Sequence, residues 1–152
     1  MNSRTVEDLL REARSFKEEG GALVREAQAE TDPSRRRGLF RKAASKYATV
    51  FAFTTGLPGS SRGSSSLPIP AEARGAVLDP ELDKEAMELE RICHQNIAIC
   101  KLNADDAKGS LEHINKAIAL GLTTSKSYSL QGQALMKVHR YEGILAWSPL
   151  KG

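Results

Sequence analysis

The stretch NIAICKLNADDAKGSLEHINKAIALG, residues 96–121, decides the fold of this chain. Its apolar residues recur at spacings of about three and four, which is the period of an amphipathic α-helix. The period breaks between Asn103 and Asp106 and then resumes. Gly121 follows the second run, at a place where glycine often ends a helix. We therefore expect two α-helices joined by a short turn, which is a helical hairpin.

The small residue at the first helix crossing of this hairpin recurs one unit further along the chain. Ala98, Ser110 and Ala117 stand at positions 8, 20 and 27 of a repeated hairpin unit. Position 8 of the next unit, 34 residues after Ala98, is Gly132. Small side chains at such positions let two helices cross closely. Two adjacent units are therefore in register without a gap.

This arrangement resembles the tetratricopeptide repeat (TPR) family, in which each unit is a hairpin of a helix A and a helix B. The layout is similar to the TPR domains of immunophilin-type co-chaperones and of the tetratricopeptide repeat protein 9 group. The resemblance covers most of residues 6–143. It implies an all-α fold, a short TPR-like superhelix of antiparallel helix hairpins.

The N-terminal hairpin fits the same template with extra residues. Phe16 and Gly20 match positions 4 and 8 of helix A, and Ala43 and Tyr47 match positions 20 and 24 of helix B. Gly20 and Ala43 are 23 residues apart, about 11 more than in the template. We expect either a longer turn or an extended first helix.

Helical periodicity divides the chain into hairpins around one segment that has none. Val6 begins a helix that runs to about Gln28, and Asp32 followed by proline is a start signal for the next helix. Segment 56–80 is crowded with Gly, Ser and Pro, so we expect a disordered, flexible insertion there. We interpret residues 1–148 as a single TPR-like domain, with a first hairpin at 6–55, the insertion at 56–80, a second hairpin at 82–122, an incomplete third unit at 125–148, and a tail at 149–152.

The third unit is expected to be incomplete. A helix over about 125–138 is followed by YEGILAWSPLKG, in which a second helix starts near Tyr141 and is broken by Pro149. One end of the repeat array then lacks a capping helix. Either the natural protein is truncated here, or Trp147 and Leu150 fold back over the open end. An open end also permits assembly into a homo-oligomer.

Composition narrows the class of protein without naming a partner. The net charge of +3 is too small to require nucleic acid or an anionic membrane. No apolar run approaches the roughly 18 residues of a membrane span, and the N-terminus has no secretory pattern. Cys93 and Cys100 lie seven residues apart in one expected helix, beyond the reach of a disulfide. We expect a reducing compartment, either the cytoplasm or the nucleus.

TPR co-chaperones often bind the C-terminal carboxylate of a chaperone tail with a clamp of five residues on their A helices. The resemblance implies part of this carboxylate clamp in the present chain. Lys17, Asn96 and Lys126 match three of its five positions, whereas Gly21 and Leu130 replace an asparagine and an arginine. The missing arginine is a bidentate donor, which a lysine does not replace. The alternative, which we favour, is that the three matching residues are ordinary helix residues.

In this family the A helices also line a concave groove for an extended or helical peptide, independently of carboxylate chemistry. The matching positions mix apolar, amide and basic groups, and this mixture suits such a peptide. They are Ile92, Gln95, Ile99, Leu102 and Asn103 in the second unit, and Lys126, Ser129, Gln133, Met136 and Lys137 in the third.

A basic cluster at the start of the second helix offers a separate surface for phosphates or acidic peptides. Aromatic residues are sparse in it, so base stacking is not indicated, and a solvated helix start is the simpler interpretation. The cluster consists of Arg35, Arg36, Arg37, Arg41 and Lys42.

Catalytic and metal-binding patterns are not found in the sequence. Cys93, His94, Cys100 and His113 lack the spacing of a zinc site. The glycines of segment 56–80 lack the Lys-Ser/Thr end of a phosphate-binding loop. We therefore expect no enzyme activity, no metal and no cofactor.

These patterns together predict a non-enzymatic protein–protein interaction module. It would be an adaptor or a co-chaperone-like protein that binds a protein or peptide partner, with a chaperone C-terminal tail as one candidate. The first alternative is a structural subunit that docks through its open third repeat. Nucleic-acid binding through residues 35–42 ranks behind both.

Overall fold

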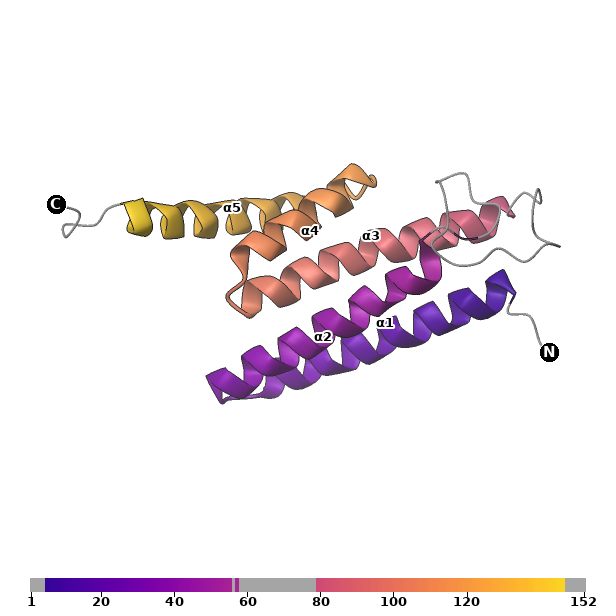
Figure 1. Cartoon of the computed structure of the whole chain (residues 1–152), viewed down its shortest axis with the longest axis horizontal. Helices are drawn as coiled ribbons and strands as arrows, with labels where there is room; N and C mark the ends of the chain where they lie inside the picture. The colour runs from indigo at the N-terminus through magenta and orange to yellow at the C-terminus, as the bar shows by residue number, and fades with distance from the viewer. Residues whose placement is uncertain (1–4, 56, 58–78, 147–152) are drawn as a thin grey trace.

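The computed structural model describes residues 5–55, 57 and 79–146, with the backbone alone for 141–146. Figure 1 shows two hairpins, α1–α2 and α3–α4, followed by α5. The expected all-α fold is confirmed, since the described residues contain helices and no strand. The helices are α1 (Val6–Ala29), α2 (Pro33–Thr54), α3 (Pro80–Asn103), α4 (Ala107–Ala119) and α5 (Ser125–Ala146).

Three helices begin after an aspartate whose side chain accepts a hydrogen bond from the first turn. Asp32 caps α2, Asp79 caps α3 and Asp106 caps α4. Proline follows the first two of these caps, at a position where its missing N–H is not needed. The start predicted at Asp32 is confirmed. α3 begins at Pro80, slightly before the expected start at residue 82, because the same Asp-Pro signal precedes it.

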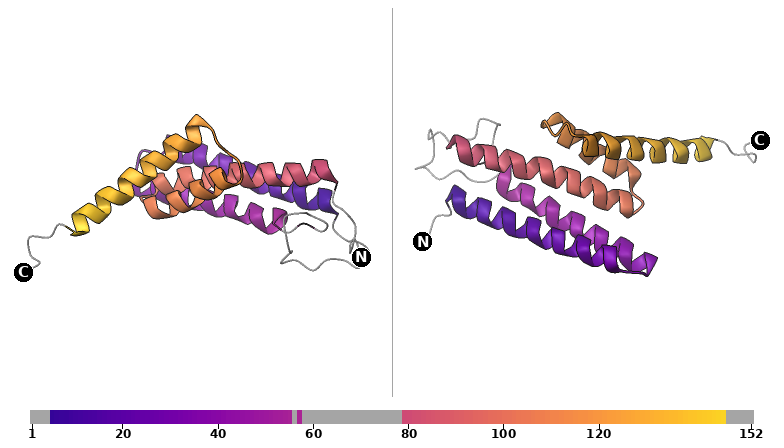
Figure 2. Two further views of the ribbon diagram at one scale, coloured as in Figure 1. Left: turned by 90° about the horizontal axis from the view of Figure 1, so that it is seen from above. Right: turned by 180° about the vertical axis from the view of Figure 1, so that it is seen from behind.

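Successive helices pack against one another along the chain, α1 on α2, α2 on α3, α3 on α4 and α4 on α5. α3 also contacts α1 and α5, so these three helices form a row. Contact between neighbouring hairpins is the packing mode of helical-repeat proteins. Figure 2 shows that the C-terminal half of α5 extends beyond the other helices.

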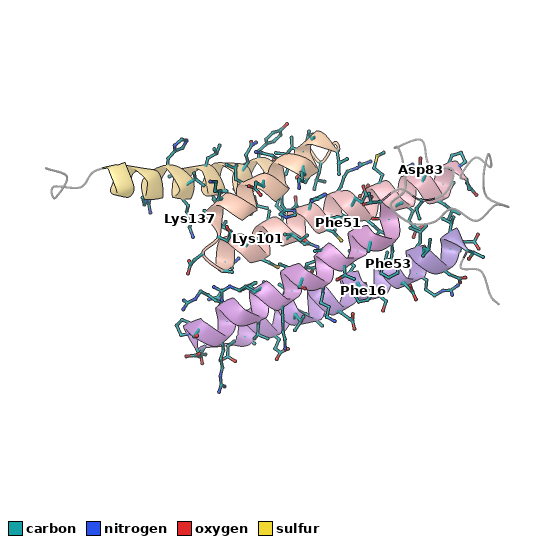
Figure 3. The ribbon with its side chains drawn as sticks, viewed as in Figure 1. Phe16, Phe51, Phe53, Asp83, Lys101 and Lys137 are labelled. Carbon is teal, nitrogen blue, oxygen red and sulfur yellow. The ribbon has the colours of Figure 1, made fainter. Side chains whose placement is uncertain are left out.

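Two clusters of buried apolar side chains hold the helices together. The larger cluster joins α1, α2 and α3, and Phe16 stacks on Phe53 against it with ring centroids 5.6 Å apart (Figure 3). The smaller cluster joins α3, α4 and α5. Its members are Ala98, Leu102, Ile114, Ala117, Leu130 and Ala134.

The segment predicted as a flexible insertion begins with a core residue. Leu57 is 2% exposed and belongs to the larger cluster. The expectation of a flexible insertion from residue 56 onward is therefore wrong at Leu57, because its side chain is buried there. The last two residues of the expected insertion also differ from the expectation, since Asp79 caps α3 and Pro80 begins it. Residue 56 and residues 58–78 lie outside the described residues.

The extra residues of the first hairpin lengthen its helices and not its turn. α1 has 24 residues and α2 has 22, and residues 30–32 separate them. The extra residues are shared between the two helices, and Gly20 of α1 still faces Tyr47 of α2 across the hairpin. Of the two expected alternatives, the extended helix is the one observed.

The small residues of the repeat pattern lie at close helix crossings. Ala98 and Ser110 are fully buried, and Ser110 Oγ donates a hydrogen bond of 2.7 Å to the Ala98 carbonyl oxygen. A Cβ atom added to Gly20 would lie 2.9 Å from the ring of Tyr47, so α1 and α2 approach closely through this glycine. Gly132 differs, because a Cβ there would meet nothing within 4 Å.

α5 is one continuous helix through Ala146. The expected break after residue 138, with a new helix starting near Tyr141, is wrong. No proline interrupts residues 125–146, and Gly132 and Gly143 each weaken a helix by only about 1 kcal/mol relative to alanine. Residues 147–152, with the proposed fold-back of the tail, lie outside the described residues.

Candidate functional site

A groove of about 530 Å³ lies between α1 and the first half of α3, and we call it the α1–α3 groove. Leucine and isoleucine side chains line it together with carboxylate and ammonium groups. Apolar surface combined with a few charged groups is the usual composition of a binding groove. The lining residues are Lys17, Glu81, Leu82, Lys84, Glu85, Glu88, Leu89 and Ile92.

Carboxylates outnumber ammonium groups in this groove, with three glutamates against two lysines. Glu85 forms an ion pair with Arg14, and Glu88 lies 3.5 Å from Arg91 Nη1. The surrounding surface is also acidic, because residues 79–91 contain six acidic and two basic residues. An occupant with basic groups therefore suits the groove better than an acidic one.

Two of the residues predicted to contact a peptide, Lys17 and Ile92, line the α1–α3 groove. Gln95, Asn96 and Ile99 follow along α3 and are half-buried. The side-chain oxygen of Gln95 is buried and receives no hydrogen bond from the described residues. Ile99 packs against the smaller core cluster. The second unit thus contributes both groove and core residues to the predicted set.

The residues predicted in the third unit are exposed on α5. Lys126 lies in the first turn of the helix, and Met136 is 64% exposed. Gln133 Nε2 donates a hydrogen bond of 3.2 Å to Ser129 Oγ. None of the α5 residues whose side chains the structure describes, 125–140, lines the α1–α3 groove. The structure therefore does not bring Lys126, Gln133 or Met136 together with Lys17.

The two positions that depart from the clamp pattern have other surroundings. Leu130 is buried in the smaller core cluster, so α5 offers no donor where the clamp has an arginine. A Cβ atom at Gly21 would lie 3.6 Å from Arg25 Nη1, so the arginine side chain covers this position. Three glutamates share the groove with Lys17. These surroundings disfavour a carboxylate ligand near Lys17.

The basic cluster is partly taken up by local contacts. The Arg36 guanidinium lies 5.6 Å from the centre of the Phe40 ring, and Arg37 Nε lies 3.9 Å from a carboxylate oxygen of Asp105. Arg37 thereby links α2 to the turn between α3 and α4. The other members, Arg35, Arg41 and Lys42, are exposed.

A second hollow of about 410 Å³ lies between α2 and α4, over the C-terminal part of α3. His113 lines it, and the Nδ1 atom of His113 lies 3.0 Å from Nδ1 of His94, so one of the two donates a hydrogen bond to the other. The His94 ring stacks on Phe51 with centroids 4.2 Å apart. Burial lowers the pKa of His94 to about 4 and also lowers the pKa of His113. Both rings are therefore neutral near pH 7.

The two cysteines are free thiols in the larger core cluster. Burial raises the pKa of Cys93 and of Cys100 to about 12, and the thiolate is the reactive form of cysteine. Within the described ranges, His, Cys, Asp and Glu side chains do not gather in groups of three that could hold a metal ion. None of the described helices is long and apolar enough to cross a membrane.

Sequence reasoning missed the carboxylates of the groove. Glu81, Glu85 and Glu88 are four and three residues apart, the spacing at which side chains share one helix face. That spacing is the signal that could have found them. Their pairing with α1 depends on how the two hairpins pack, which the spacing does not give.

The fold and the α1–α3 groove define a small all-helical protein of stacked hairpins with a lateral groove. Comparison with protein-family models, curated proteins and solved structures finds no match to this chain.

Proposed function

We propose that this chain is a non-enzymatic protein–protein interaction module of the TPR type, an adaptor or co-chaperone-like protein that holds a peptide segment in the α1–α3 groove. The groove carries the proposal, because it combines apolar and charged groups between the first helices of two successive hairpins. Amphipathic helices and extended segments bind in grooves of this kind.

The charges of the groove indicate the class of peptide. Leu82, Leu89 and Ile92 offer apolar contact, and the glutamates beside them attract cations. We expect an amphipathic segment that presents apolar residues on one side and Lys or Arg beside them. An acidic chaperone tail is the alternative occupant, and it would depend on Lys17 and Lys126.

The module as proposed uses no cofactor and acts in a reducing compartment, the cytoplasm or the nucleus. Free, buried thiols at Cys93 and Cys100 support this choice of compartment, since proteins of oxidising compartments commonly pair their cysteines.

Fluorescence anisotropy with two labelled synthetic peptides tests the proposed function. One peptide carries Leu and Lys at α-helical spacing, and the other is an acidic peptide with a free C-terminal carboxylate. We expect the basic peptide to bind at least about tenfold more tightly, a difference of about 1.4 kcal/mol. The double variant Glu81→Lys, Glu88→Lys should lose this preference, because it reverses two charges of the groove.

The matched control is the double variant Glu26→Lys, Glu112→Lys, which makes the same charge change at exposed positions outside the groove. It should bind the basic peptide as the natural chain does. Binding of the acidic peptide that is lost in both Lys17→Glu and Lys126→Glu would instead establish the carboxylate clamp. If neither peptide binds at low salt, the proposed groove function is wrong.

A further inference from the structure

α5 carries the large apolar side chains that the described part of the chain leaves exposed. Tyr128 is 51% exposed, Leu135 is 38% exposed and Met136 is 64% exposed. Large apolar groups gathered on one element of a soluble domain mark an interaction surface. α5 is therefore the element for which a partner is expected.

The repeat register shows that one face of α5 is without its usual cover. The residues 34 positions before Tyr128, Gly132 and Leu135 are covered by α4. His94 contacts His113 there, Ala98 accepts a hydrogen bond from Ser110, and Lys101 pairs with Asp106. At Gly132 a Cβ atom would meet nothing within 4 Å, so no described helix occupies the equivalent place on α5.

The charge of α5 is the opposite of that around the α1–α3 groove. The α5 sequence, residues 125–146, contains three basic residues, Lys126, Lys137 and Arg140, and one acidic residue, Glu142. Residues 79–91, which include most of the groove, contain six acidic and two basic residues. Opposite charges on two surfaces steer them together and fix their orientation.

We infer that residues 135–140 of α5 of one copy dock in the α1–α3 groove of a second copy. Met136 and Arg140, four residues apart on one face of the helix, would enter the groove, where Met136 would contact leucine and isoleucine side chains and Arg140 would face the glutamates. Leu135 and Lys137 would flank them at the two edges of the groove. The occupant fits the amphipathic, basic segment that the groove favours. This inference rests on the proposed function, because it places a second copy in the same groove.

The occupant must come from another copy because α5 cannot reach the groove of its own chain. Ser127, Leu130 and Ala134 anchor α5 as buried residues. Lys137 on α5 and Asp83 beside the groove lie toward opposite ends of the molecule (Figure 3). Contacts between different surfaces of identical chains are heterologous, so they build rings or open chains of copies. The groove is lined by eight residues, fewer than the roughly 20–30 that each side of a standard interface contributes, so association should be weak and concentration-dependent.

Analytical ultracentrifugation of two complementary variants tests the inference. Met136→Glu, Lys137→Glu disables the α5 surface, and Glu81→Lys, Glu88→Lys disables the groove. The four side chains that these variants replace are all exposed, and Glu88 forms an ion pair with Arg91 at the surface. Neither variant removes a core side chain, so both should fold, which circular dichroism checks. We expect the average mass of the natural protein in solution to rise above the 16.5 kDa of one chain as its concentration increases. Each variant alone should stay monomeric.

An equimolar mixture of the two variants gives the sharpest outcome. One intact groove and one intact α5 remain, so the mixture should form a dimer of twice the chain mass and stop there. A natural chain that stays monomeric at every concentration overturns the inference. Association that persists in the groove variant alone, through α5 faces meeting each other, overturns it as well.

The peptide experiment separates this inference from the proposed function. If the natural chain is monomeric and its groove still binds the basic amphipathic peptide, the second-copy inference fails and the proposed function stands. If the chain neither self-associates nor binds the peptide, both fail.

Discussion

Gly20 and Gly132 stand at the same position of the repeat unit and have opposite surroundings. At Gly20 the missing side chain lets the Tyr47 ring lie against the α1 backbone, because a Cβ would be 2.9 Å from ring atoms. At Gly132 a Cβ would meet nothing within 4 Å. The first glycine is required by packing, whereas the second only lowers helix stability.

Alanine substitutions at these two glycines should therefore change stability in opposite directions. Gly20→Ala forces the buried Tyr47 ring to move and should lower the free energy of unfolding by about 1–3 kcal/mol. Gly132→Ala removes backbone freedom from the unfolded chain and should raise it by about 0.5–1 kcal/mol. Urea unfolding of both variants measures the difference. A loss of stability in Gly132→Ala would show that something covers this face of α5.

Polar contacts between α3 and α4 stabilise this hairpin in addition to the smaller core cluster. Ser110 bonds to the Ala98 carbonyl, and His94 pairs with His113. Burial, the largest cause, lowers the pKa of both imidazoles, and for His94 the neighbouring His113 adds to it. Protonating this pair should therefore loosen the α3–α4 hairpin.

The free energy of unfolding should fall as the pH drops from about 6.5 to about 4. In this window an unfolded histidine, with an ordinary pKa of 6.5, binds a proton that folded His94, with a pKa of about 4, does not. The loss should be on the order of 1 kcal/mol, after discounting the shift for the partly exposed rings. Urea unfolding at several pH values measures it. In the double variant His94→Gln, His113→Gln this part of the pH dependence should disappear, and its persistence would contradict the assignment to the pair.

The helices could largely be predicted from the sequence, because their signals are local. Asp32 with its following proline and the glycine at 121, whose φ is 104°, mark boundaries that depend on a few neighbouring residues. The continuity of α5 could not be predicted, because the hairpin unit of the repeat implies a break between residues 138 and 141, whereas no proline interrupts the helix there. Leu57 was not predicted as a core residue, because its burial depends on packing in the larger cluster of α1, α2 and α3. Its Gly- and Pro-rich neighbours in the sequence give no signal of that packing.

The candidate site was predicted only in part, because its residues come from different hairpins whose packing is not encoded locally. Lys17 and Ile92 line the groove as the repeat register predicts. The register also predicts that Lys126, Gln133 and Met136 of α5 join them, whereas none of these three residues lines the groove. Which helices share a groove is decided by the packing of one hairpin on the next, and a single sequence contains no direct signal for that packing.

At the scale of the whole molecule, charge is separated along the row of helices. Residues 79–91 are mainly acidic. Residues 33–46 contain six basic residues and no acidic residue, and residues 125–140 contain three basic residues and no acidic residue. The acidic part surrounds the groove, and α5 extends beyond the other helices at the far side (Figure 1). The separation supports a groove that selects basic, amphipathic segments.

Amide chemical-shift mapping by NMR tests this groove function most directly. The variant Met136→Glu, Lys137→Glu, which we expect not to self-associate, is titrated with the basic amphipathic peptide. Shift changes should concentrate in α1 around Lys17 and in α3 between Glu81 and Ile92, and they should weaken as salt is added. Changes that instead lie on α2, α4 or the basic cluster, or no changes at all, would contradict a binding function for the α1–α3 groove.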